Sequence, residues 1–366
     1  MVRRLALLWA LLLLALPAAR AEAASGEWLA RAGMGRLESA AEALGAKSPA
    51  DIARRVFAGE PALDIEGAVG ALRGLLGSVK TRLLFALRSV AVPVLAVLLL
   101  RLLLGRRDGP LALLCRLSCA LSLATVCADA LQSARETMAA LSKAADALSP
   151  VLATALTLTG EGGVAAALTP ASALCVDIIE NVLKDAGVPL CAVAATVNIA
   201  GGLSERLRLD RLFALLKRWT TLCAGLLCAG FGALVSAEGR LAALQDGAST
   251  RAVRAALRSA IPFIGRSLSD SAGALVQSAS LAKGAVGAAG VALAASVCAG
   301  ALARLLAQAV SLKLAAAAIE PVADDGIARI TAGFGDVAGM LMALCAAALM
   351  LDVMLCGTCL GLFSGA

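Results

Sequence analysis

The residues of this chain that could carry out chemistry are few, because it contains no histidine and no tyrosine. Without imidazole, a Ser-His-Asp triad, a Cys-His pair and a histidine-ligated metal site are all excluded. Cys356 and Cys359 have the C-x-x-C spacing that supports dithiol exchange in a thioredoxin-like fold. Here no βαβ pattern surrounds them, which favours incidental cysteines in an apolar terminal stretch. The sequence therefore predicts no enzyme, no cofactor and no metal site.

Glycine clusters are a second place where chemistry could occur, since glycine-rich loops bind phosphates. The clusters at 160–163 and 284–290 are not followed by the Lys-Ser/Thr pair of a phosphate-binding loop, and no strand pattern precedes them. This argues against nucleotide binding. The second cluster and the pair Gly335 and Gly339 have the spacing that lets helices approach closely, either within the fold or between subunits. The sequence leaves both alternatives open.

The composition indicates a membrane protein. Of 366 residues, 60% are hydrophobic and 16% are charged, which is more apolar surface than a soluble core of this size can bury. The net charge of +7 comes from basic residues placed between apolar stretches, a pattern that suits anionic lipid headgroups better than nucleic acid. All 11 cysteines lie in or beside apolar stretches, as small buried hydrophobic residues do.

The chain begins with the features of a secretory leader. Two arginines precede a leucine-rich core from Leu5 to Leu16, and the small residues Ala19 and Ala21 fit an A-x-A cleavage pattern. An uncleaved core would remain as an anchor. We expect three parts, namely a signal peptide at 1–21, a short translocated helical region at 22–82 and a polytopic transmembrane domain at 83–366.

Apolar stretches near the length of a membrane span recur along the third part, so the predicted fold is all-α, with about six to seven transmembrane helices. They are Leu83 to Leu104, Leu111 to Leu131, Val151 to Leu168, Val188 to Leu203, Trp219 to Ala237, Ala285 to Ile319 and Val337 to Phe363. Glycines surround Glu161 within the third stretch, which predicts a re-entrant or broken helix. The stretch from Ala285 is long enough to be either one tilted helix or two.

Basic residues divide almost evenly between the two sides of the membrane, so the positive-inside rule does not fix the orientation. We favour six spans with a re-entrant stretch after Val151, because this places the basic segment Arg206–Arg218 in the cytoplasm. That segment has the pattern of an interfacial amphipathic helix that leads into the span at Trp219. A second amphipathic helix is predicted over Arg251–Leu268, bent at Pro262.

Charged residues within or beside the spans are the remaining candidates for function, because a charge in hydrocarbon is costly and usually faces a partner or water. They are Arg116, Asp129, Glu161, Arg304, Lys313, Glu320 and Asp352. Asp129, Lys313 and Glu320 can also be interpreted as interfacial residues that reach outward. We select Glu161, Arg304 and Lys313 as candidate intramembrane polar residues.

Two segments of the second half resemble the stage III sporulation protein AE family. One runs from Val253 to Asp270 and continues through Ser280–Gly287; the other is Lys313–Asp324. Thr169–Ala173 and Val197–Ala200 fit the same family more loosely. The resemblance has no catalytic residues to transfer. It implies motif and packing positions only, at Ile261, Pro262, Gly265, Asp270, Lys283, Gly284, Gly287 and Pro321.

The same resemblance implies a place for the protein in endospore formation. Members of the family lie in the mother-cell membrane around the forespore, together with the other products of the stage III sporulation A operon and a forespore-side partner. These proteins are thought to form a secretion-like channel. On this basis we expect a structural or channel subunit, with the lipid bilayer and possible further copies of itself as contacts and no nucleic acid. The alternative is a stand-alone secondary transporter or permease, for which broken helices and intramembrane charges are also expected.

Overall fold

The computed structural model describes residues 34–43, 48–51, 53, 110–158, 164–203, 209–260, 265–320 and 325–360. The predicted leader at 1–21 and the first predicted span, Leu83 to Leu104, lie outside the described residues. The helices are α2 (Met34–Ala43), α5 (Pro110–Leu158), α6 (Val164–Val182), the π-helical turn η1 (Leu183–Gly187), α7 (Val188–Leu203), α8 (Asp210–Ala260), α9 (Gly265–Ile319) and α10 (Asp325–Leu360).

The predicted all-α membrane fold is confirmed. The described residues contain no strand, and they form five helices that are long and apolar enough to cross a membrane. Their ranges are 116–154, 171–203, 210–237, 284–319 and 326–357. Together with the predicted span at 83–104, these would make six, the smaller of the two numbers expected.

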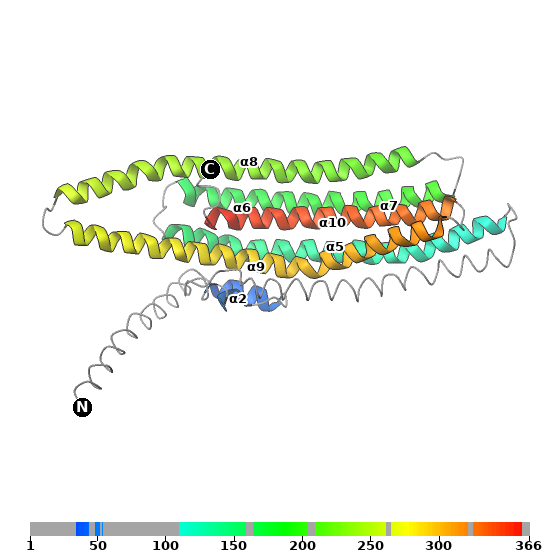
Figure 1. The fold of residues 1–366 in the computed structure, drawn as a ribbon, viewed down its shortest axis with the longest axis horizontal. Coiled ribbons are helices and arrows are strands. Elements are labelled where there is room, and N and C mark those ends of the chain that lie inside the picture. Colours follow the sequence, from blue (N-terminus) through cyan, green and yellow to red (C-terminus); the bar gives the residue numbers. More distant parts are fainter. Residues whose placement is uncertain are drawn as a thin grey trace, which may run out of the picture.

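The long helices lie side by side in one elongated bundle (Figure 1). α10 contacts α5, α6, α7, α8 and α9 and therefore occupies the centre. The helices α6, η1 and α7 follow one another without a break and act as one long rod. α5, α8 and α10 begin at the end of the bundle where α7 and α9 finish (Figure 1). The six-span order favoured above requires these five helix ends to lie on one side of the membrane.

α5 is a single helix across two predicted stretches, Leu111 to Leu131 and part of Val151 to Leu168. The segment between them is helical because alanine, leucine, methionine and charged residues with long side chains dominate it. Residues 164–168 of the stretch Val151 to Leu168 belong to α6, which lies beside α5 and runs in the opposite direction (Figure 1). That stretch is therefore divided between two helices, and its interruption, with Glu161, lies outside the described residues.

The predicted bent helix over Arg251–Leu268 is wrong. α8 ends at Ala260 and α9 begins at Gly265, and the two helices run in opposite directions from there (Figure 1). Proline at 262 removes a backbone donor and disfavours helical geometry in the preceding residue. The proline therefore marks the boundary between two helices. α9 also settles the long stretch Ala285 to Ile319, which is one uninterrupted helix.

The bundle is held together largely by small residues. Alanine, leucine and cysteine make up most of the buried side chains. The prediction of small buried hydrophobic residues holds for Cys119, Cys127, Cys191, Cys298 and Cys345, whereas Cys175 and Cys228 are half-buried and Cys223 is exposed. Cys356 is also buried, whereas the Cys359 side chain lies outside the described residues.

Glycine allows a close helix crossing, which joins α7 to α10. Asn198 is buried in α7 and donates a hydrogen bond from Nδ2 to the backbone oxygen of Ile330, at 2.9 Å. A Cβ atom at Gly333 would collide with the Asn198 carboxamide, and one at Gly202 would collide with the side chain of Ile330. These two glycines are what lets the backbones approach, and the asparagine fixes their register.

Candidate functional site: polar groups inside the helical bundle

A cluster of ion pairs joins α8, α9 and α10 near one end of the bundle. Asp336 of α10 lies between two lysines, with its carboxylate oxygens 2.9 Å from Lys217 Nζ and 3.1 Å from Lys313 Nζ. A separate pair links Arg329 of α10 to Asp210 of α8 at 3.3 Å. Because all five side chains are partly exposed, each pair stabilises the fold modestly. Their main effect is to fix the register of three helices.

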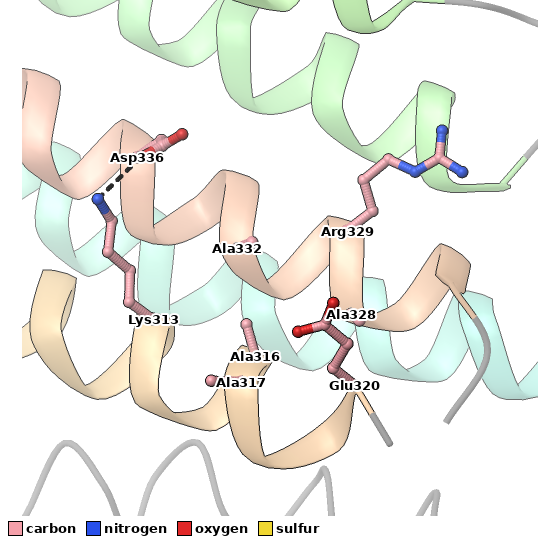
Figure 2. A pocket seen from close by; sticks show the side chains of 8 residues that line it. All are labelled: Lys313, Ala316, Ala317, Glu320, Ala328, Arg329, Ala332 and Asp336. Carbon is pink, nitrogen blue, oxygen red and sulfur yellow. Dashed lines mark ion pairs between the residues drawn. The ribbon is translucent and has the colours of Figure 1, made fainter. Parts of the chain in front are cut away.

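A pocket of about 470 Å³ opens beside this cluster, between α9 and α10. Its walls combine alanines with charges of both signs, from Lys313, Ala316, Ala317, Glu320, Ala328, Arg329, Ala332 and Asp336. Figure 2 shows Lys313 paired with Asp336, the Glu320 side chain near Ala328, and Arg329 pointing away toward the neighbouring helix. The segment Lys313–Asp324, noted above for its resemblance, supplies half of this lining.

Replacing Asp336 with asparagine should destabilise the junction. The substitution keeps the side-chain shape but leaves two lysines facing each other without a counter-charge. We expect a loss of about 1 kcal/mol in the free energy of unfolding, since the groups are partly solvated. A thermal-denaturation cycle on the purified full chain measures this. The loss should be smaller when Lys313 is already replaced with methionine, and an equal loss in both backgrounds would contradict the ion-pair account.

A second polar group lies in the core. Glu180 of α6 is 3% exposed and Asp352 of α10 is 0% exposed. None of the four carboxyl oxygens has a hydrogen-bond donor within the part of the chain that the structure describes. Asp352, Asp177 and Asp146 are the acidic groups near enough to act on Glu180 electrostatically. An unpaired charge in such a place costs several kcal/mol, so this pair requires a physical explanation.

The outer surface of α5 carries a third set of polar residues, which we call the charged α5 face. It consists of five exposed side chains, Asp129, Arg135, Glu136, Lys143 and Asp146. The outer surface of α8 is different in kind, since Trp219, Leu222 and Leu226 are exposed there at 59%, 49% and 69%. One side of the bundle is therefore suited to lipid and another is not.

These two surfaces lie at the same depth. The side chain of Arg116 lies against Gly326, and Leu148 and Cys356 meet at Gly290, so α5 and α10 are offset by about 209 residues. α8 and α10 are offset by 119 residues, as the hydrogen bond from Cys228 to the Ala347 oxygen shows. Residues 129–136 of α5 and 219–226 of α8 are consequently level with the same part of α10. The charged α5 face begins where α8 presents no charged side chain.

The structure places the predicted site residues unevenly. Lys313 belongs to the ion cluster, whereas Arg304 is exposed on α9. Gly287 is buried and Gly284 half-buried. Gly265, Asp270 and Lys283 lie in α9, but their side chains are outside the described residues, as are Glu161, Ile261, Pro262 and Pro321 altogether.

The apolar stretches do not reveal Glu180, because it lies between two of them, Val151 to Leu168 and Val188 to Leu203. The signal was present in the helical periodicity. Val176, Glu180 and Leu183 follow an i, i+4, i+7 pattern, and all three are buried. An acidic residue in the middle of such a stripe must face the protein interior if the helix continues. Asp352 was recognised as a charged residue inside a span, but its partner could not be named.

The sequence is similar to that of known sporulation proteins. The stage III sporulation protein AE of Bacillus subtilis (strain 168) is 26% identical over 176 residues, which cover 48% of this chain and 44% of that protein. The match therefore spans less than half the length of that relative. No solved structure matches the chain. The sequence pattern of a family described as stage III sporulation protein AE matches residues 56–361. The chain therefore belongs to the stage III sporulation protein AE family, whose members are sporulation proteins, and it has the helices of a membrane protein.

Proposed function

We propose that this protein is a structural or channel subunit of a multi-protein, secretion-like complex that is required during endospore formation. It would lie in the mother-cell membrane around the forespore, with the other products of the stage III sporulation A operon and a forespore-side partner. Membership of the family supports the link to sporulation. The five helices that could cross a membrane support the location in a bilayer. No catalytic role is part of the proposal.

The charged α5 face is the main observation that supports a role within an assembly. Asp129, Arg135 and Glu136 lie at the depth of the apolar surface of α8, where a lone protein would meet lipid tails. A charged side chain at that depth costs several kcal/mol unless protein or water lies opposite it. A partner subunit, or a conduit enclosed by several subunits, removes this cost. Such a surface is therefore expected of a subunit that works in an assembly.

Affinity purification from sporulating cells tests this proposal. The tagged full chain should bring the other operon products with it. Replacing Glu136 and Lys143 together with leucine should reduce their recovery by about tenfold, which corresponds to roughly 1.4 kcal/mol of lost contact energy. Changing the exposed Leu222 and Leu226 of α8 to valine gives the matched control, because this keeps the lipid-facing surface apolar.

Two results would contradict the proposal. Recovery of the chain alone, in gentle detergent and with normal yield, would favour the alternative of a stand-alone transporter or permease. Equal recovery of partners with the α5 and α8 variants would show that the charged α5 face does not contact them. Yield and thermal stability of each variant, measured in parallel, separate a lost contact from a misfolded chain.

A further inference from the structure

The buried acids Glu180 and Asp352 have no role in the function proposed above. They lie on different helices, α6 and α10, and both belong to the ranges that could span a membrane. Evolution of a purely structural core would favour apolar side chains here, because a buried ionised group is stabilising only when it is well paired. The absence of a donor around all four oxygens among the described residues sharpens the question.

The groups that act electrostatically on the pair, among the described residues, are two further acids and a thiol. Asp177 lies on the same helix as Glu180, Asp146 comes from α5, and the Cys298 thiol of α9 lies near Asp352. The basic side chain that follows α6, Lys184 of η1, donates to Asn181 Oδ1 at 3.0 Å, and Asn181 donates to Asp177 at 3.1 Å. The cation therefore acts on Asp177 and does not reach the buried pair.

Two ionised carboxylates cannot remain together in such a site, since their repulsion adds to the cost of removing each from water. One proton removes the repulsion between the two carboxylates and leaves a single buried charge. The protonated carboxyl can then donate a hydrogen bond to its ionised neighbour. We propose that Glu180 and Asp352 form a proton-binding site in the bundle core, in which one proton is held between the two carboxyl groups. The site joins α6 to α10 only while that proton is present.

Access to this site is provided by the other two acids. Asp177 is half-buried and Asp146 is exposed, so together they form a graded acidic path from the core to the charged α5 face. Acidic chains of this kind exchange protons between a buried group and water. The packing of α10, which contacts six other helical segments among those described, would consequently respond to the occupancy of one proton.

Infrared spectroscopy of the purified full chain in detergent tests the site with the proton itself as the probe. At neutral pH the unmodified protein should show the carbonyl stretching band of a buried protonated carboxylic acid, and this band should disappear as the pH is raised. Glu180→Gln and Asp352→Asn should each abolish it, because the remaining carboxylate then receives an amide donor. Asp185→Asn, which changes an exposed acid of η1 outside this path, serves as the matched control and should retain the band.

Thermal denaturation gives a second readout that needs no variant to fold identically. The unmodified chain should lose stability as the pH rises and the shared proton leaves, and Glu180→Gln should lose less. No protonated band at neutral pH, or a band that survives both core variants, would overturn the proposal. Stabilisation by sodium chloride relative to choline chloride, without the band, would identify a metal-cation site and overturn it too. None of these outcomes depends on which proteins copurify with the chain.

Discussion

Gly333→Ala should destabilise the fold by about 3 kcal/mol, from overpacking and the loss of one interhelical hydrogen bond. The new methyl group would collide with the carboxamide of Asn198, which is buried and cannot turn toward solvent. Asn198 would have to give up its bond to the Ile330 oxygen, or α7 and α10 would have to separate. Thermal denaturation of the purified full chain should show a midpoint lower by about 5 °C or more.

Gly339→Ala is the matched control, because it makes the same substitution in the same helix. A Cβ atom at Gly339 has no neighbour within 4 Å, and alanine is the better helix former. Its midpoint should equal or exceed that of the unmodified chain. Equal midpoints for the two variants would mean that α7 and α10 do not approach as closely as described. Of the predicted pair, only Gly335 packs tightly within the fold, because a Cβ atom at this position would lie 3.3 Å from the Ala309 oxygen of α9.

Gly290→Leu should have a comparable effect where α5, α9 and α10 meet. A Cβ atom at this position would lie 2.7 Å from Cys356 Sγ and 2.8 Å from Leu148 Cδ2. Both neighbours are completely buried, so the remaining leucine atoms have no free volume to occupy. We expect a loss of about 3 kcal/mol, or failure of the chain to accumulate in the membrane.

Gly284→Leu tests whether position matters more than side-chain size. The two glycines belong to the same helix, but a Cβ atom at Gly284 meets nothing within 4 Å. This variant should accumulate and melt normally. If it is as unstable as Gly290→Leu, general intolerance of bulk on α9 would explain both results. Gly287 of the same helix is buried, so Gly287→Leu should block close helix contact and lower the yield of the assembled complex.

The hydrophobicity of the sequence is sufficient to determine the fold class. Long apolar stretches can satisfy their backbone only as helices in a bilayer, so an all-α membrane protein followed from composition and length. The resemblance over Val253–Gly287 and Lys313–Asp324 identified the family. The lengths of the helices did not follow from hydropathy. Hydropathy identifies residues that lipid can surround, but it does not identify helical residues that lie outside the hydrocarbon. Residues 132–150 lie between two of the predicted apolar stretches, and they nevertheless continue α5 as helix.

The polar sites depended on the tertiary structure to a greater extent. Sequence alone established that Lys313 and Asp352 carry charge inside apolar stretches, that the chain has no histidine, and that its glycines are spaced for close packing. It could not establish that Asp336 lies between two lysines, or that Glu180 lies near Asp352 and 172 positions before it in the chain. Such pairings depend on helix register, which is set by the summed packing of many small side chains across α10 and its neighbours. No local sequence pattern encodes this packing, so the pairs cannot be predicted from the sequence alone.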